Sequence, residues 1–287
     1  YWNSNDYINN SGIITKFEGN LKNSNYRAEN TTDHKNDQNN IELAGAVSLL
    51  SSLPLEKQSE NYNKILTPKL MLRTAPIRMR DMSNSQLKLG VSNLYALNKL
   101  SDIGVIETGT SLTLGTDYSY KDNNNFEKFN FSLGQVFSYD DNADMATQST
   151  LNEKTSELVG NLNYNLNKSS KVGYKFSLDH NYDALNYNEI SGVFKINKLV
   201  TNFEYLEENN HIGDGHYLGA GLTLELDKSN SLNFETRKNF ATSATEFYNL
   251  RYQYENDCLR AEIKYNKSFY SDNDLEPTED IMFTLTI

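Results

Sequence analysis

The feature that most constrains the fold is a strict alternation of apolar and polar residues in long segments. Segment 258–266 shows it clearly, because four apolar residues alternate there with four polar ones. These are Leu259, Ala261, Ile263 and Tyr265 against Arg260, Glu262, Lys264 and Asn266. Successive side chains of a β-strand point to opposite faces, so this pattern indicates a strand with one apolar and one polar face. Helical periodicity is hard to find, and the chain is predicted to be all-β.

Alternation and turn signals together divide the chain into about fourteen strands. The predicted strands cover residues 12–27, 40–53, 62–74, 105–121, 126–139, 156–166, 170–180, 186–196, 198–207, 215–226, 230–238, 244–254, 258–270 and 279–287.

The connections between these strands alternate between long and short. Tight turns are predicted at 121–125, 167–169, 227–229 and 255–257, and longer Asn/Asp-rich connections at 75–104, 140–155, 208–214 and 271–278. Short turns at one end, long loops at the other and apolar-out, polar-in strands are typical of an antiparallel transmembrane β-barrel. Aromatic residues near strand ends, such as Tyr118, Tyr252 and Phe269, fit a membrane-interface girdle. Stretch 51–61 is longer than this scheme expects.

Composition excludes several classes of protein. The formal net charge of -11 argues against a nucleic-acid-binding surface, which needs a concentrated basic footprint. The single cysteine, Cys258, excludes a disulfide framework within the chain and any CxxC motif. The chain begins YWNSND, without Met or an apolar leader, and we expect it to be the C-terminal piece of a longer protein.

Catalytic and metal-binding patterns find no support in the sequence. His211 and His216 flank a Gly-rich loop, but a metal site needs further ligands. The acidic stretches 140–144 and 272–280 favour solvated loops over a divalent-cation site. No G-x-S-x-G is present and Cys258 has no histidine near it in sequence, so we expect neither an enzyme nor a cofactor.

The polar faces of the last strands carry mixed charge. Arg251, Arg260, Glu262 and Lys264 are predicted to face the interior of the barrel. Such a face suits a water-filled lumen that polar or sugar groups cross, without identifying the solute.

Several motifs occur in an order that resembles a known family. They are LTPKLMLRTAP, then an NLF-like and an N-x-x-S-x-x-D-like element, then a Gly-rich strand and a Gly-Gln-aromatic strand. The matching residues are Asn93, Leu94, Asn98, Asp102, Gly109, Gly115, Gly134 and Gln135. From about residue 40 to the end, the chain resembles the C-terminal barrel region of the lipopolysaccharide-assembly proteins of the LptD/OstA type, in particular their alphaproteobacterial branch.

The resemblance implies a function and a set of partners. Proteins of this family take lipopolysaccharide from an LptA-type periplasmic bridge and insert it into the outer leaflet of the Gram-negative outer membrane. The saccharide passes through the lumen, which holds an LptE-type lipoprotein plug, and the lipid leaves between the first and last strands. The chain would then lack the first strands and the periplasmic β-jellyroll domain.

Two further expectations concern the C-terminus, which the resemblance places in the periplasm. The last strand, with Ile281, Phe283, Leu285 and Ile287 on one face, would form one side of the lateral gate. Cys258 would lie at the periplasmic end of the preceding strand, where family members use cysteines to bond the barrel to the periplasmic domain. That compartment is oxidising, so such a disulfide can persist there. An unpaired thiol is the alternative.

Other functions stay open at this point. A passive porin or substrate-specific channel would also have this strand pattern, and would conduct ions. A surface adhesin would bind a partner through the long connections 75–104 and 140–155. An outer-membrane hydrolase lacks a nucleophile and base in a credible arrangement.

Overall fold

The fold is known from a computed structural model, which describes all residues except 31–38, 78, 101–103, 210–214, 270–276 and 287. It divides into two compact units. The first contains Tyr1–Leu162 and Phe176–Asn186, and the second contains Asn163–Lys175, Tyr187–Asn209 and Gly213–Ile287. No helix in the described ranges is long and apolar enough to cross a membrane.

Strands make up nearly all of the regular structure. In chain order they are β1 (Trp2–Asn3), β2 (Tyr7–Ile8), β3 (Ile14–Arg27), β4 (Asn39–Ser52), β5 (Leu55–Ser59), β6 (Tyr62–Ala75), β7 (Gly109–Asp122), β8 (Glu127–Ser138), β9 (Leu158–Asn167), β10 (Ser170–Leu178), β11 (Leu185–Ile196), β12 (Leu199–Glu208), β13 (His216–Glu225), β14 (Asn230–Asn239), β15 (Ala244–Glu255), β16 (Arg260–Ser268) and β17 (Glu279–Thr286). One short 3₁₀ helix, η1 (Thr147–Ser149), interrupts the connection after β8.

All fourteen predicted strands are present, each shifted by at most four residues. The predicted number was too low by three, because β1, β2 and β5 also form. The first two contain two residues each, and β5 (LEKQS) has no apolar alternation and is exposed along its whole length. Such strands exist only through their partners, so the sequence pattern does not reveal them.

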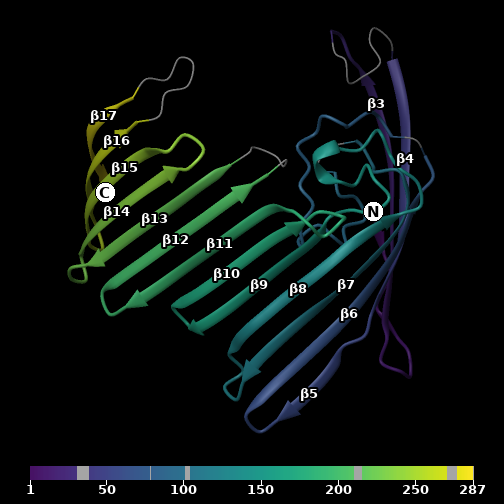
Figure 1. The fold of residues 1–287 in the computed structure, drawn as a ribbon, viewed down its shortest axis with the longest axis horizontal. Coiled ribbons are helices and arrows are strands. Elements are labelled where there is room, and N and C mark those ends of the chain that lie inside the picture. Colours follow the sequence, from purple (N-terminus) through teal and green to yellow (C-terminus); the bar gives the residue numbers. More distant parts are fainter. Residues whose placement is uncertain (31–38, 78, 101–103, 210–214, 270–276, 287) are drawn as a thin grey trace. The chain divides into compact units, whose positions relative to one another are not determined.

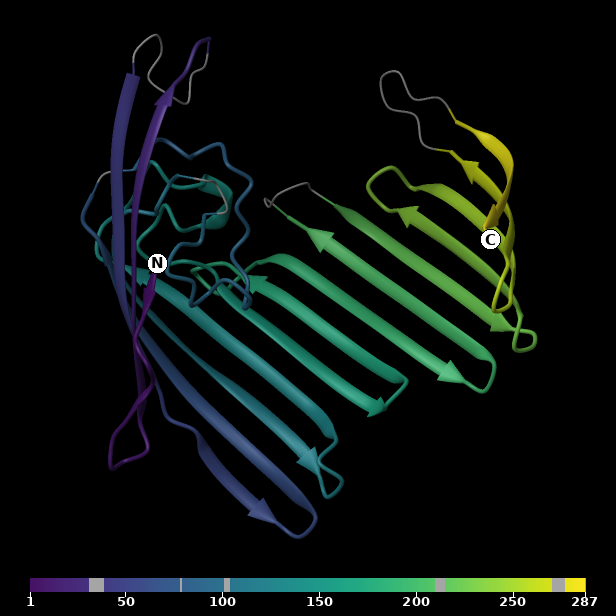
Figure 2. The ribbon, with the colours of Figure 1, turned by 180° about the vertical axis from the view of Figure 1, so that it is seen from behind.

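The β5 strand explains the long 51–61 stretch. Residues Val47–Ser52 of β4 pair with β6, and β5 then pairs with the remainder of the same strand, so that Ser59 lies opposite Tyr62. Between β4 and β5 the path breaks at Pro54, which has no N–H to donate, while the Leu53 N–H bonds the Pro68 carbonyl. The true turn is therefore 60–61, as short as the barrel pattern requires (Figures 1 and 2).

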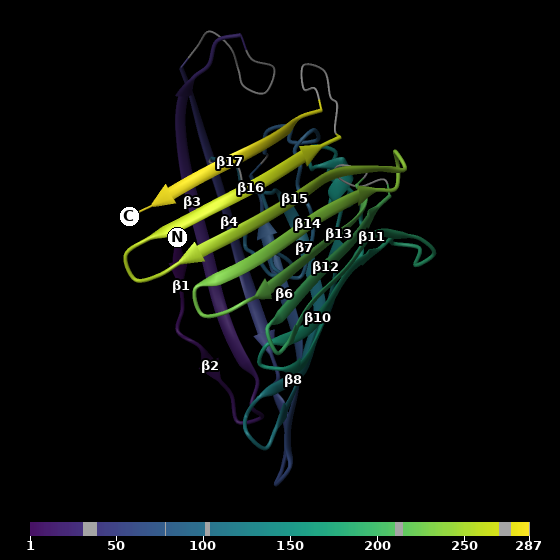
Figure 3. The same ribbon diagram turned by 90° about the vertical axis from the view of Figure 1, so that its left-hand side faces the viewer.

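In the second unit, strands β11 to β17 pair in chain order, each antiparallel to the next. The connections at 197–198, 226–229 and 256–259 gather at one end of these strands, as Figure 3 shows. Those at 209–215, 240–243 and 269–278 join the opposite ends. The 240–243 connection has the same length as 226–229. The predicted difference between short turns at one end and long connections at the other therefore does not hold for every strand pair.

The register gives each pair of strands one apolar and one polar face. In the second unit, one row across the strands runs through Ile196, Leu199, Leu224, Leu232, Tyr252, Ile263 and Phe283. A row three residues away, on the other face, contains Asn202, Gly221, Glu235, Asn249, Asn266 and Asp280. Phe283 is 67% exposed and Ile263 is 51% exposed, so the apolar face contacts no protein core. Large exposed apolar surfaces of this kind mark contact with lipid or with other proteins.

We predict that the two faces respond oppositely to a charge. Leu222→Arg, in the middle of β13 on the apolar face, should lower the free energy of unfolding in lipid vesicles by about 2–4 kcal/mol, because the charge enters hydrocarbon. Thr223→Arg, the next residue on the polar face, is the matched control and should change it little. Denaturant titration in vesicles measures both, and equal losses would contradict the assignment of the faces.

Candidate functional site: a folded layer on the inner face of the first unit

The inner face of β6, β7 and β8 is covered by irregular chain. The register places Met71, Arg73, Ser111, Thr113 and Val136 on this face. Each is buried, and the Met71 and Thr113 side chains are fully so. The cover comes from the two connections 76–108 and 139–157, which we call the inner layer.

The inner layer has its own apolar core. The first connection contributes six buried residues and the second contributes three, and they pack with two strand residues. The cluster contains Met79, Leu87, Leu89, Leu94, Leu100, Val105, Met145, Ala146, Leu151, Val136 and Val159. Fully burying one large apolar side chain contributes about 1.5–3 kcal/mol. The two connections are therefore folded against the sheet, and not the solvated loops that their Asn/Asp content suggested.

Two glycines of the family-like motifs form the docking surface for this layer. A Cβ atom at Gly134 would overlap the Cδ2 atom of Leu94. One at Gly115 would overlap the Tyr95 hydroxyl and the Leu133 carbonyl. The Asn-Leu-Tyr element thus rests directly on the backbone of β7 and β8, which only glycine permits. The Asn-Leu-Tyr element and the glycines of β7 and β8 therefore form one contact between the inner layer and the sheet.

The two motif asparagines stabilise the irregular backbone. Asn93 Nδ2 donates to the Lys88 carbonyl at 2.8 Å, while its Oδ1 accepts from the Gly90 N–H at 2.9 Å. Asn98 Nδ2 donates to the Leu100 and Val105 carbonyls, and its Oδ1 accepts from the Glu107 N–H. Buried backbone groups outside regular structure need such partners. Asp102, the last residue of this element, is among the residues that the structure leaves undescribed.

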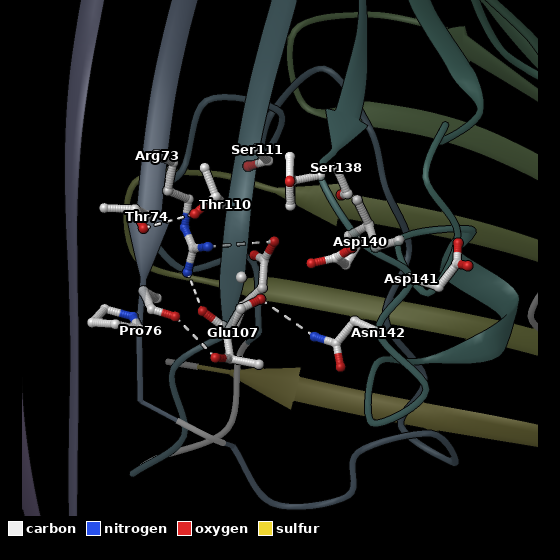
Figure 4. Close-up of a pocket in the computed structure, with 15 residues that line it drawn as sticks. Arg73, Thr74, Pro76, Glu107, Thr110, Ser111, Ser138, Asp140, Asp141 and Asn142 are labelled. Atoms are coloured by element: carbon white, nitrogen blue, oxygen red, sulfur yellow. Dashed lines mark hydrogen bonds and ion pairs between the residues drawn. The ribbon is translucent and has the colours of Figure 1, made fainter.

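A buried group of three charged side chains joins the inner layer to strand β6. Arg73 of β6 donates from Nε to the Leu97 carbonyl at 2.6 Å and from Nη2 to the Glu107 carbonyl. Its Nη1 lies 3.8 Å from Glu107 Oε1, and Lys99 Nζ lies 3.5 Å from Glu107 Oε2. Both cationic side chains are fully buried, so one carboxylate balances two desolvated cations. Figure 4 shows Arg73 beside Glu107.

The pKa values of Glu107 and Lys99 both lie below their ordinary values. Burial acts to raise the pKa of Glu107, but Lys99 and Arg73 outweigh it and hold that pKa below 4.5. Burial lowers the pKa of Lys99 below 10.5, and Arg73 lowers it further against the opposing effect of Glu107.

Gln135 connects the edge of the layer to the following loop. It shares a face with the exposed Leu114, the apolar one, yet it is only 5% exposed itself. Its Nε2 donates to the Ser156 carbonyl at 2.8 Å, and its Oε1 accepts from the Tyr182 hydroxyl at 2.8 Å. The Gln135 amide therefore has both a hydrogen-bond donor and an acceptor as partners. Without them it would be an unsatisfied polar group on the apolar face.

A polar cavity of about 350 Å³ lies beside the buried charges. Its walls are the end of β6, the start of β7 and residues 138–142 (Figure 4). Arg73, Glu107, Thr110, Ser111, Asp140 and Asn142 supply polar groups to it. No group of three or more metal-ligating side chains occurs in the part of the chain that the structure describes.

The remaining predicted residues lie in the second unit. Arg251 and Lys264 are direct cross-strand partners, and Arg260 and Glu262 lie on the same face of β16. Ile281, Phe283 and Leu285 share the opposite, apolar face of β17, while Ile287 falls outside the described residues. Cys258 is free and exposed in the turn before β16. The chain holds no second cysteine, so a bond to a cysteine elsewhere stays a prediction.

Predictions from the sequence missed the buried charges. Arg73, Lys99 and Glu107 stand in segments assigned to a strand or to an extracellular loop. A usable signal was present, because 87–106 contains seven Leu, Val and Ile residues that prove to be buried. That content is high for a solvated loop.

Of the two histidines considered as metal ligands, His211 lies outside the described residues. His216 contacts the rings of Tyr205 and Phe240.

Antiparallel strands with one apolar and one polar face, and with the apolar rows exposed, are typical of outer-membrane β-barrel proteins. The family model "LptD: LPS transport system D" matches residues 4–233. The chain belongs to this family, and therefore to the lipopolysaccharide transport system of the outer membrane. The match includes residues 4–39, which precede the region of resemblance noted above, and it ends before β15.

Other comparisons add little. No curated protein matches the chain. Among solved structures it is similar to a triple mutant of the Rh. blastica porin, at 10% identity and a TM-score of 0.37, covering 90% of each chain. It is also similar to Acinetobacter baumannii OccAB4, at 10% identity and a TM-score of 0.30, covering 95% of this chain and 86% of that one.

We predict that the glycine contact can be tested by rescue. Gly134→Ala should destabilise the inner layer by about 1–3 kcal/mol, because the new methyl group overlaps Leu94. Adding Leu94→Ala should cost less than the sum of the two single changes, because the two residues touch. Proteolysis rates of the inner layer measure this. Gly90→Ala is the control, since a Cβ there meets nothing within 4 Å, and additive effects at 94 and 134 would refute the contact.

We predict that acid loosens the inner layer. The pKa of Glu107 is lower in the folded layer than its ordinary 4.5, so its stabilising contribution is complete above that pH and is lost as pH falls through the folded pKa. Hydrogen exchange of peptides covering 93–107, corrected for intrinsic rates, should show this step. Glu107→Gln should remove the step and destabilise the layer at neutral pH by about 3–5 kcal/mol, because two buried cations lose their counter-charge. An unchanged acid step in that variant would contradict the assignment.

Proposed function

We propose that this chain is the C-terminal part of an outer-membrane barrel that inserts lipopolysaccharide into the outer leaflet. The family match over residues 4–233 carries the proposal. The separation of the strands into one apolar and one polar face supports it, because such strands place lipid on one side and a hydrated path on the other. The saccharide follows the polar face, and the lipid leaves between the first and last strands.

The last strand has the properties that a lateral opening needs. Every side chain of β17 is exposed, and its pairing to β16 covers only eight residues. An opening between strands must be brief, since each unpaired backbone group facing lipid is costly. No step in this mechanism breaks a covalent bond, so we propose no catalytic residue and no cofactor.

The partners belong to the same proposal. An LptE-type lipoprotein occupies the lumen, and an LptA-type bridge delivers lipopolysaccharide to a periplasmic domain that precedes this chain. The C-terminus lies in the periplasm. Arg260 pairs with Thr286, so the turn that holds Cys258 is at the same end of the strands as the C-terminus and faces the same compartment.

The inner layer bears on the alternatives. A passive porin needs an open interior, whereas here a layer with its own apolar core covers the inner face of β6–β8. An adhesin would present the connections 75–104 and 140–155 to a partner, whereas many of their described residues are buried. Both observations favour a transporter that controls passage.

The test is a disulfide across the proposed seam. In the full-length protein with Cys258→Ser, one cysteine in β17 and one in the first strand should lock the seam, and surface lipopolysaccharide should fall to the level of a depleted strain. Adding a reductant should restore it. Surface lipopolysaccharide is measured by labelling intact cells.

The control lies within this chain. Glu262→Cys with Thr284→Cys joins β16 and β17 directly opposite each other on the polar face, and it does not cross the seam. This variant should export normally. Normal export with a fully oxidised seam would sink the proposal, and ion conductance that persists in that variant would favour the channel.

A further inference from the structure

Two cations face each other on the polar side of β15 and β16 without a counter-ion. Arg251 and Lys264 are direct cross-strand partners, which places their side chains on one face with Cβ atoms about 4.5–5.5 Å apart. Like charges at such positions destabilise a strand pair. In the described part of the chain, neither side chain has an ion pair or a hydrogen bond.

Several other cations on the strands of the same unit are paired with carboxylates. Five of them contact a carboxylate within ion-pair distance. The pairs are Lys175–Glu189, Lys195–Glu225, Arg237–Glu246, Arg260–Glu255 and Lys267–Glu279. Carboxylates are thus plentiful on these strands, and the arrangement leaves the two central cations without one. Glu262 is the next residue on this face of β16, yet it forms no ion pair with either.

Arg251 carries a second cost. Its Nε atom is enclosed by protein and has no acceptor, and an unsatisfied buried donor costs about 1–3 kcal/mol. Local rules broken without compensation occur mainly at functional sites. Two adjacent cations, one of them a planar guanidinium, match the geometry and charge of a phosphate group.

The surroundings supply neutral hydrogen-bonding groups. Asn233 of β14 lies directly opposite Arg251, and its Oδ1 is enclosed without a donor. Asn249 and Asn266 form the adjacent pair on the same face, and Gln253 follows on the other side. The enclosed Oδ1 atoms of Asn233 and Asn266 have no donor, so they can accept hydrogen bonds from hydroxyl groups next to a phosphate.

We propose that Arg251 and Lys264 form a binding site for phosphate groups on the polar face of the second unit. The proposal rests on the proposed function only for the source of the phosphate, which is then the phosphorylated glycolipid in transit. Its geometry and charge stand apart from that function. A free inorganic phosphate would meet the same chemistry.

Calorimetry on the purified full-length protein in detergent tests the site, with inorganic pyrophosphate as the probe. Wild-type protein should bind it with an affinity that falls as salt rises. Arg251→Gln and Lys264→Gln should each weaken binding at least about tenfold, because each removes a hydrogen bond to a charged group. Unchanged binding in the double variant, or no binding to wild type, would overturn the proposal.

Lys267→Gln is the matched control. Lys267 lies three residues further along β16 on the opposite face and is paired with Glu279 at 3.1 Å. This variant should bind pyrophosphate as wild type does. An equal loss in Lys267→Gln would show that only the net charge matters and would also overturn the site.

A second pair of probes separates the two sources of phosphate. Micelles of a bisphosphorylated glucosamine lipid and of its dephosphorylated form are titrated into wild type and the double variant. Tighter binding of the phosphorylated lipid in wild type alone identifies the lipid as a ligand. Binding of pyrophosphate but not of this lipid would leave a free-phosphate site.

The site and the transport function can fail separately. Normal lipopolysaccharide export in the double variant, together with absent pyrophosphate binding in wild type, overturns the site and leaves the transport proposal standing. Pyrophosphate binding at the site in a protein whose depletion leaves surface lipopolysaccharide unchanged would overturn the transport proposal alone.

Discussion

Backbone hydrogen bonding between antiparallel strands is the constraint on which the rest of this structure depends. In lipid, no water replaces a missing strand partner, so every strand must pair along its length. Once the register is fixed, it determines which side chains point to each face of the sheet. The row that contains Ile263 and Phe283 is apolar for this reason, and the row three residues away, on the other face, carries Asn266 and Asp280.

The inner layer follows a different physical rule. Its backbone is irregular, and its stability comes from an apolar core, two asparagine side chains and three buried charges. A buried ion pair is a weak source of stability, because desolvation cancels much of the attraction. What Arg73 adds is location: it ties the Leu97 and Glu107 carbonyls, which belong to the layer, to one point on β6. The charges therefore fix where the layer sits, and removing only one of them is costly because its partners stay buried without a counter-charge.

The sequence predicted the strands well because alternation is a local signal. Segments such as 258–266 contain that signal within nine residues, and the structure places a strand there. β5 was missed because its pattern is polar throughout and only β6 makes it a strand. The inner layer was missed for a related reason: the contact between Leu94 and Gly134 joins positions forty residues apart, and neither residue shows its partner by type. The resemblance to a family supplied both motifs, but not the fact that they touch.

Gln135 restricts the length and path of the loop 179–184, because its amide needs a hydrogen bond from Tyr182 of that loop. The amide shares the apolar face with Leu114, and the hydroxyl of Tyr182, from the short connection after β10, caps it. Tyr182 reaches this position with a backbone φ of 64°, in the left-handed region that residues other than glycine seldom adopt. The length and path of residues 179–184 are thus tied to a single polar atom on another strand. Insertions there, which surface loops usually tolerate, would uncover an amide on the apolar face of β8.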